Sequence, residues 1–457
     1  MIESLFNSYE FIFIFLPITL GGYFLLGGSH RFLILASLIF YAYWDLNFLP
    51  ILLGSMIVNF LIAGRILESK HQKQFFIAGL IFNIGLLSYF KYLPPEKILP
   101  LGISFFTITQ LLYLYDCFAG VAKDHDSIRY ALFVSFFPHL LAGPILYHRQ
   151  MMKQFRDESL KKINFENLSR GLILFTIGLS KKVLIADQLS PFVAENFSNP
   201  NDLSMIQAWI VASSYTLQLF FDFSGYSDMA VGLARMMNFE IPINFNAPYR
   251  ATNLINFWQR WHISLTNAIT ACVYLPIMKF FKSKTILNTC IASFVTFFIV
   301  GIWHGSGWTF FCFAMCTASS IVVNYLWRSM GFSLPKIPSH ILLMMFVIST
   351  MVFLRSDNLD IAMKILGSMF AGDLEFPRKI VELTNYIGLN LNVGNVPGDL
   401  PKSIFLIGIL IVIFAPTSNQ IVKKIEPRFA ISILIGAILF IGILQLSSVT
   451  EFLYFQF

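Results

Sequence analysis

The chain has 457 residues, of which 56% are apolar and 12% are charged. Soluble domains carry about 25% charged residues, so this low charge and a mean hydropathy of +0.69 exclude an ordinary soluble globular protein. The long apolar runs also differ from the alternating segments of about ten residues that build an outer-membrane barrel. The composition therefore predicts an all-α polytopic membrane protein that lies in the lipid bilayer.

The formal net charge of +7 does not predict binding to nucleic acid. Lys and Arg lie in short loops between apolar runs, where the positive-inside rule expects them. The N-terminal segment has neither a basic region nor a small-residue cleavage site, so we expect it to remain as the first span. The cysteines are odd in number and lack a C-x-x-C pair, which predicts free thiols and no metal site: Cys117, Cys272, Cys290, Cys312 and Cys316.

About a dozen apolar windows cross or nearly cross a bilayer by the criterion of about 20 residues, which predicts about 11–13 transmembrane helices. Several windows are short or contain Gly and Pro, which is tolerated at membrane depth only where protein or a water-filled cavity covers the freed backbone groups. We therefore expect a functional interior. In chain order the windows are Tyr9–Leu26, Phe32–Leu49, Leu52–Ile66, Phe75–Tyr92, Leu99–Phe118, Leu168–Ala186, Met205–Phe221, Ile286–Trp303, Trp308–Trp327, Ile341–Leu354, Ile404–Phe414 and Ile431–Leu446.

Three further stretches are not predicted to be simple spans. Phe136–Tyr147 contains two prolines and precedes a basic loop, which favours a re-entrant or kinked segment. Ser356–Pro401 is an acidic connection that we place outside the membrane. Gly225–Thr285 is predicted to hold an interfacial or half-buried helix on the cytoplasmic side, because apolar side chains recur at spacings of three and four: Leu254, Phe257, Trp258, Trp261 and Leu265.

His304 is the strongest candidate for chemistry. It lies in GIWHGSGW, directly between two apolar runs. An ionisable group at membrane depth is costly and is by default a functional-site hypothesis, and histidine exchanges protons near neutral pH. The alternative is a structural histidine bonded to a neighbouring helix. The flanking Trp303 and Trp308 are placed to line or seal a cavity.

Other polar residues in apolar surroundings leave more than one interpretation open. His262, in FWQRWHISL, is either an interfacial histidine or a catalytic or substrate-binding one. The sequence leaves the role of His139 undecided. Asp222 and Asp228 either take part in a proton relay or pair with Lys or Arg to fix helices, and pairing is the commoner role. The sequence contains no H-E-x-x-H, Walker A, G-x-G-x-x-G or G-x-S-x-G motif, so the corresponding enzyme classes lose their usual support.

Sequence blocks along nearly the whole chain carry a family resemblance: FNSYEFIFIFLPI, LGISFFTITQ, FFPHLLAGPI, LSKKVLIAD, FDFSGYSDMAVGLARMMNFEIPINFNAPY, FWQRWHISL, GIWHGSGW, VFLRSDNL, FAPTSNQ and FLYFQF. In this order they resemble the membrane-bound O-acyltransferase family. The similar branch contains the bacterial proteins of alginate and peptidoglycan O-acetylation and of D-alanyl transfer to teichoic acid. The resemblance implies one membrane-embedded domain over 1–457, with a core at 95–330 around a central tunnel and peripheral helices at 1–94 and 331–457.

By this resemblance, His304 is the family's near-invariant histidine within the tunnel, and His262 is its second catalytic-site histidine. The implied reaction moves an acetyl group from a cytoplasmic thioester, acetyl-CoA, to a hydroxyl acceptor used outside the membrane, without a permanently bound cofactor. A histidine in an enclosed tunnel can act as general base. Four residues are assigned to the tunnel or its support: Trp261, Trp303, Asn246 and Asp222.

The resemblance also implies partners and a location. The C-terminal FLYFQF looks like an aromatic motif whose Tyr454 takes the acyl group transiently, the alternative being an interfacial aromatic anchor. We expect the bacterial inner membrane, an extracytoplasmic partner of the SGNH esterase type, and a polysaccharide or peptidoglycan acceptor. D-alanyl transfer, a transporter and a non-catalytic scaffold for a periplasmic enzyme are the alternatives.

The chain departs from the family pattern at two places. Thr270 and Ala271 stand where Arg and Asp are expected after RWHISL, and His139 replaces a common glutamine. Thr270 and Ala271 lack the charged groups of Arg and Asp, so the contact that this pair is expected to make, with the acyl donor or on the cytoplasmic side, is affected.

Overall fold

The computed structural model describes residues 6–92, 99–123, 125–201, 203–377, 392–394, 400–426, 429–446 and 453. Nearly all of this part of the chain is helical, which confirms the predicted all-α membrane class. Besides turns and irregular connections, the described residues include two short strands, β1 (Glu375–Pro377) and β2 (Asn392–Gly394), which pair in parallel.

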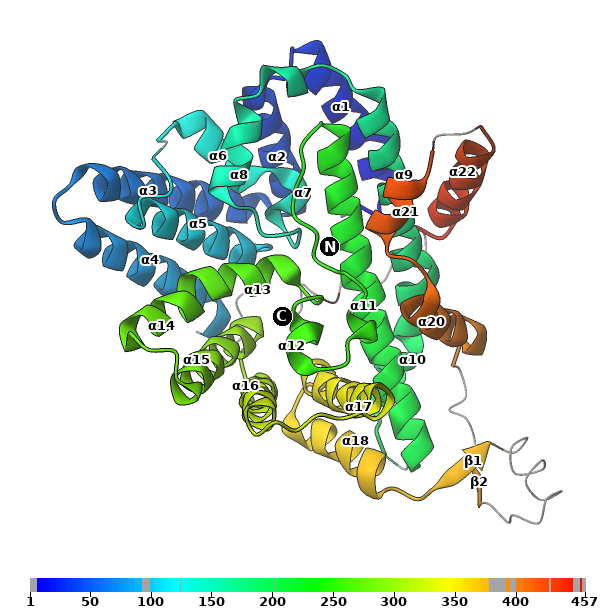
Figure 1. Ribbon diagram of the computed structural model, residues 1–457. Coiled ribbons are helices and arrows are strands. Elements are labelled where there is room, and N and C mark those ends of the chain that lie inside the picture. The colour runs from blue at the N-terminus through cyan, green and yellow to red at the C-terminus, as the bar shows by residue number, and fades with distance from the viewer. Residues whose placement is uncertain are drawn as a thin grey trace.

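The first part of the chain forms a group of helices in which α3 packs against α4 and α5, and α2 against α6 (Figure 1). Between α3 and α4, the side-chain amides of Asn59 and Asn83 donate to each other's oxygens at 3.2 and 2.6 Å. Such buried amide pairs join apolar helices in membranes. The elements are η1 (Phe11–Phe15), α1 (Leu16–Leu25), α2 (His30–Trp44), η2 (Leu46–Phe48), α3 (Leu49–Glu68), α4 (Gln72–Tyr92), α5 (Ile103–Phe118), α6 (Ser127–Ser135), α7 (Phe137–Leu140), α8 (His148–Phe155) and η3 (Glu158–Lys161).

The long helix α11 (Met205–Met236) runs through the middle of the molecule and is buried over most of its length (Figure 1). It packs along a helical run made of α9 (Phe165–Lys181), the π-helical turn η4 (Lys182–Ala186) and α10 (Asp187–Ser198). Gly171 faces the carbonyl of Gly232, and Gly178 faces that of Gly225, so close that a Cβ atom on either Gly171 or Gly178 would clash with this backbone. Small residues at this interface let the two backbones approach closely.

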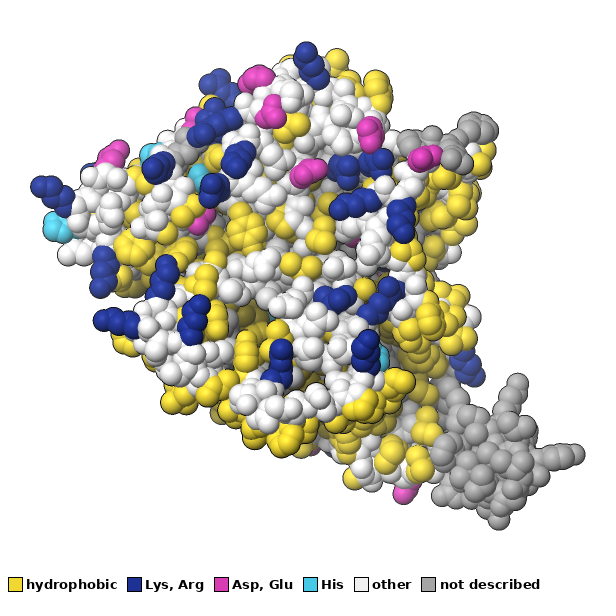
Figure 2. Space-filling model, viewed as in Figure 1, with side chains coloured by type: hydrophobic (Ala, Val, Ile, Leu, Met, Phe, Trp, Pro, Cys, Tyr) yellow, Lys and Arg dark blue, Asp and Glu magenta, His cyan; other side chains and the backbone are white. Residues whose placement is uncertain are grey.

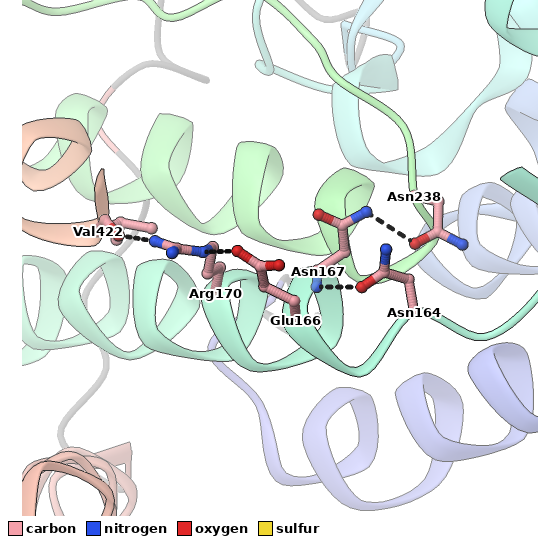
Figure 3. A network of polar contacts seen from close by, with 6 residues as sticks. All are labelled: Asn164, Glu166, Asn167, Arg170, Asn238 and Val422. Carbon is pink, nitrogen blue, oxygen red and sulfur yellow. Dashed lines mark hydrogen bonds and ion pairs between the residues drawn. The ribbon is translucent and has the colours of Figure 1, made fainter. Parts of the chain in front are cut away.

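A polar network joins the first turns of α9 to the chain just after the C-terminal end of α11 (Figure 3). The Asn167 side-chain amide donates to Asn238, just after α11, at 3.0 Å. Arg170 pairs with Glu166 at 2.8 Å and donates to the carbonyl of Val422. The network therefore joins α9 both to the end of α11 and to α21.

The remaining elements form most of the long apolar helices. By length and composition, six helices in the described residues can cross a membrane, or seven if the bent pair α20 and α21, with a 65° break, is one span. Other predicted windows form shorter apolar helices, such as α1, α5 and α22. The elements are η5 (Pro248–Arg250), α12 (Leu254–Trp258), α13 (Ile263–Ile269), η6 (Thr270–Tyr274), α14 (Leu275–Phe281), α15 (Ile286–His304), α16 (Trp308–Ser329), α17 (Lys336–Arg355), α18 (Leu359–Ala371), α20 (Lys402–Phe414), α21 (Ser418–Lys424) and α22 (Phe429–Leu444).

The structure corrects several predicted elements. Helix α11 continues past Phe221, because its polar positions are paired inside the protein instead of ending the helix. The predicted stripe across residues 254–265 is broken between α12 and α13, and residues Ile263–Phe281 form a candidate span. The connection Ser356–Pro401 contains α18, which the sequence did not predict. Phe136–Tyr147 is not a simple span, as predicted: it forms the short helix α7 followed by irregular buried backbone that protein covers.

Apolar side chains are exposed around the rim of the molecule. Figure 2 shows Lys and Arg side chains spread over the face turned to the viewer, and hydrophobic ones gathered at its edge over α16, α17, α20 and α22. Exposed members on these helices are Val323, Ile337, Leu406 and Leu434. A contiguous apolar rim of this kind is unfavourable in water and suits a lipid environment.

Candidate active site

The chain turns sharply at His262, directly before α13. Its backbone lies in the left-handed region, at φ 46° and ψ 53°, which costs a residue other than glycine roughly 1–2 kcal/mol. Hydrogen bonds on the following residues hold the turn. The Ile263 N–H donates to the carbonyl of Asn244 at 3.0 Å, and the Ser264 hydroxyl donates to the Asn244 side-chain oxygen at 2.6 Å.

The irregular segment after α7 supports the same turn. The N–H of Ile145 donates to the Ser264 hydroxyl oxygen at 2.9 Å, and the Tyr147 hydroxyl donates to the Ser264 carbonyl at 3.1 Å. The buried ring of His262 packs edge-on against Phe223 of α11, with 4.8 Å between the centroids. Strained backbone persists only where the surroundings over-determine it, and here three segments of the chain do so.

His304 is the last residue of α15, and the end of this helix is bonded to α4. The last carbonyls of a helix have no partner within the helix. The Lys91 ammonium donates to the carbonyl of Trp303, and the Tyr92 hydroxyl donates to that of Ile302 at 2.5 Å. Lys91 was missed by sequence reasoning, although a lysine at the end of the apolar run of α4 was a usable signal.

His262 and His304 line one small cavity of about 40 Å³. They meet because α13 and α14 run away from His262, while α15 returns to end at His304. The ring of His304 also packs against Trp303 and Phe313, at 5.1 and 6.1 Å. The other lining residues are Trp258, Trp261, Leu265, Thr266, Ile269, Thr270, Thr296, Phe297 and Val300. Apart from the threonine hydroxyls and the histidines, this lining is apolar and suited to excluding water.

A larger pocket of about 410 Å³ begins at the turn directly after His304. Residues 306–310 form one wall, and residues 354–359, at the end of α17 and the start of α18, form another. Tyr215 of α11 and Leu453 complete the lining. The small cavity is therefore lined by His304, the last residue of α15, and the wide pocket is lined from Ser306 onward, two residues further along the chain.

The predicted support residues lie in different places. Trp261 lines the small cavity, and Trp303 packs against the rings of His304 and Phe105. Asn246 is exposed: its backbone N–H donates to the carbonyl of Arg260, and its carbonyl accepts from the Arg260 guanidinium. Asn244, in contrast, is the buried amide that holds the His262 turn. The family resemblance assigned Asn246 to the tunnel or its support, whereas the role of Asn244 is visible only in its three-dimensional contacts.

Among the remaining predicted residues, Asp222 is not part of the lining of either cavity. Asp222 lies in a buried ion-pair cluster with Lys182, at 2.8 Å, so it follows the helix-fixing interpretation. Tyr454 lies outside the described residues. His139 is buried, and its ring contacts the Phe133 carbonyl at 2.9 Å, which is a structural role.

The departure from the family pattern lies within the site. Thr270 lines the small cavity, and its hydroxyl donates to the Thr266 carbonyl at 2.6 Å, inside the helix. It begins the π-helical turn η6, which includes Ala271. At this position the cavity is lined by the methyl and hydroxyl groups of Thr270. Within the described residues, no group of three or more His, Cys, Asp or Glu side chains is placed to hold a metal ion.

Comparison with known proteins agrees with this architecture. The profile of the membrane-bound O-acyltransferase family matches residues 100–353, which include both histidines. The chain is 34% identical to a peptidoglycan O-acetyltransferase of Helicobacter pylori, over 99% of this chain and 97% of the relative. It is 31% identical to a probable alginate O-acetylase of Pseudomonas syringae pv. tomato, over 99% and 100%.

A more distant relative is a teichoic acid D-alanyltransferase of Bacillus subtilis, 29% identical over 46% of this chain and 55% of the relative. The family match covers more than half of the chain, and the relatives with O-acetylating names align along nearly all of it. The chain is therefore a multi-pass membrane O-acyltransferase, which uses an acyl donor, and it belongs to the membrane-bound O-acyltransferase family.

Proposed function

We propose that this protein transfers an acetyl group from acetyl-CoA to a hydroxyl acceptor, for the O-acetylation of an extracytoplasmic polysaccharide or cell-wall polymer. The observation that carries this proposal is the meeting of His262 and His304 in one small, mostly apolar cavity beside a pocket of about 410 Å³. Such a cavity keeps water from a thioester. The wide pocket gives an acceptor a place next to the histidine.

In the proposed reaction, His304 removes the proton of the acceptor hydroxyl as its oxygen attacks the thioester carbonyl. The oxygen–carbon bond forms, the carbon–sulfur bond breaks, and the proton passes from the imidazole to the leaving thiolate. General base catalysis of this kind contributes about 10²- to 10⁴-fold. The bonds from Lys91 and Tyr92 to the end of α15 hold the backbone beside the base.

His262 is assigned to handling the acyl donor or the acceptor within the same cavity. Its left-handed backbone directs the ring into the space between α13 and α15, opposite His304. Trp261 provides an apolar wall of the cavity, and Trp303 packs edge-on against the ring of His304 from outside its lining.

We assign Tyr454 as a transient acyl carrier that passes acetyl to an extracytoplasmic partner of the SGNH type. The support is that the preceding residue, Leu453, lines the wide pocket after His304. A tyrosine hydroxyl beside a general base is a reasonable nucleophile. Bacterial relatives named for peptidoglycan and alginate O-acetylation favour an inner-membrane location and a polymer acceptor.

The relatives favour acetyl over D-alanyl transfer. The two with O-acetylating names align over 99% of this chain, whereas the D-alanyltransferase aligns over 46%. Both donors are thioesters, so the same base serves either. Competition between acetyl-CoA and a D-alanyl thioester in the assay below distinguishes them.

The test uses purified protein in nanodiscs with radiolabelled acetyl-CoA. We expect His304→Ala to lower thioester turnover by about 10²-fold or more. His71→Ala, an exposed histidine in the loop before α4, is the matched control and should keep parental activity. Parental turnover in His304→Ala would exclude His304 as the general base.

Tyr454→Phe locates the acceptor. Label that is retained on the parent chain and lost in both His304→Ala and Tyr454→Phe supports the tyrosine carrier. Label lost only in His304→Ala places the acceptor on a partner or polymer. No turnover by the parent with partner and polymer supplied would overturn the acetyl-CoA proposal.

A further inference from the structure

Two neighbouring lysines at the start of the π-helical turn η4 pair with different aspartates of α11. Lys181 contacts Asp228 at 2.6 Å and is partly exposed, whereas Lys182 contacts Asp222 at 2.8 Å and is buried. Lys182 also contacts Asp187 at 2.6 Å. Single π-helical turns inside α-helices recur at functional sites, and this one gives each lysine its own partner.

The inner cluster contains two carboxylates and one ammonium group, each almost completely buried. A buried charge is costly unless hydrogen bonds satisfy it, and one lysine does not neutralise two carboxylates. Asp222 receives a further bond from a distant part of the chain: its second oxygen accepts the backbone N–H of Leu453 at 3.1 Å. The cluster therefore binds the C-terminal segment through its main chain.

This contact lies beside the candidate active site. Leu453 is buried and lines the pocket of about 410 Å³ together with residues 306–310, which directly follow His304. Asp222 thus connects the helix pair α9–α11 at the centre of the molecule to the wall of that pocket. The neighbouring pair of Lys181 and Asp228 has no bond to residue 453. Asp228 instead accepts the hydroxyl of Ser418 in α21 at 2.5 Å.

We propose that Asp222, held in place by Lys182, is a positioning residue that anchors the C-terminal segment at Leu453 beside the turn after His304. The anchor fixes the backbone of Leu453, the residue that precedes Tyr454 in the sequence. Its importance for catalysis rests on the proposed function, whereas the anchoring itself does not.

Hydrogen exchange of the full-length protein in nanodiscs tests the anchor without any activity. We compare the parent with Asp222→Leu, which removes the acceptor oxygen but leaves Lys182 paired with Asp187, and with Asp222→Asn, which keeps an acceptor oxygen. The peptide containing Leu453 should exchange about tenfold faster in Asp222→Leu, since hydrogen bonds to charged groups are stronger than average. Asp222→Asn should lie between the leucine variant and the parent.

Asp228→Asn is the matched control, because it disrupts the neighbouring ion pair on the same two helices. It should leave exchange at Leu453 unchanged. Exchange at Leu453 that stays parental in Asp222→Leu, or that rises equally in the Asp228→Asn control, would overturn the proposal. So would a loss of protection along α9 and α11 as large as that at Leu453. If Asp222→Leu does not fold, the same criteria apply to Asp222→Asn alone.

Transfer kinetics then test the catalytic consequence. We expect Asp222→Leu to lower kcat about tenfold or more while the KM for acetyl-CoA stays near the parental value, with partial rescue in Asp222→Asn. If the parent itself transfers no acetyl, the proposed function fails, but the exchange result still decides the anchor. If transfer stays parental while Leu453 is released, the anchor has no role in catalysis.

Discussion

Backbone strain marks one residue of the site. His262 adopts φ 46°, although it is not glycine, and the turn is held by the bonds that Asn244 makes to residues 263 and 264. A Cβ atom in this region costs roughly 1–2 kcal/mol. We therefore predict that His262→Gly is more stable than His262→Ala by about 1 kcal/mol, the reverse of their usual order in helices.

Unfolding by SDS in mixed micelles measures this difference. Both variants lose the packing of the ring on Phe223 equally, so the comparison isolates the backbone. An alanine variant as stable as the glycine variant would contradict the left-handed turn.

Single residues were predicted from the sequence where an ionisable group interrupts an apolar run. His304 was identified in this way, whereas the assignment of His262 to the site came from the family resemblance, and the structure brings the two together. Lys91 and Asn244 were not identified, because their roles come from contacts with the carbonyl of Trp303 and with residues 263 and 264 that no local pattern specifies.

At the scale of elements, the pair α9 and α11 depends on glycines at the contact. A Cβ atom on Gly178 would lie 2.5 Å from the Gly225 carbonyl oxygen and 2.7 Å from the Met229 nitrogen. Both are backbone atoms, so no side-chain rotation can relieve the clash. We predict that Gly178→Ala lowers the free energy of unfolding by about 1–3 kcal/mol. Thermal unfolding in detergent measures the change.

Gly85→Ala is the control for this prediction. Gly85 is exposed on α4, and a Cβ atom there would meet no atom within 4 Å. This variant should be as stable as the parent or slightly more stable, because alanine favours helices. Equal effects of the two substitutions would show that helix propensity, rather than the close contact between α9 and α11, determines the change in stability.

Helix boundaries were predicted well where the hydropathy of the sequence alone determines them. They were predicted poorly where polar residues are buried and paired inside the protein. The windows for α4, α15 and α16 agree closely with the structure. Helix α11 was predicted too short, since Asp222 and Asp228 read as polar positions although each is paired with a lysine. The regular spacing across residues 254–265 could not reveal the turn at His262, because that turn depends on hydrogen bonds to Asn244.

At the scale of the whole molecule, the pocket of about 410 Å³ and the basic loop lie at opposite ends of α15. We therefore predict that these two ends are accessible from opposite sides of the membrane. Helix α15 has 19 residues and is therefore about 28 Å long at 1.5 Å per residue, close to the hydrocarbon thickness of about 30 Å. Lys284 precedes it in a basic loop, and Ser306 follows it in the pocket of about 410 Å³. By the positive-inside rule, the basic end lies in the cytoplasm.

Cysteines at the two ends of α15 therefore predict opposite labelling. In a cysteine-free background, Ser306→Cys should react with a membrane-impermeant maleimide in intact spheroplasts, because Ser306 is exposed and lines an open pocket. Lys284→Cys should react only after the membrane is permeabilised. Labelling of both sites from the same side would show that α15 does not cross the bilayer, and the acceptor would then have to reach His304 from the face on which the thioester enters.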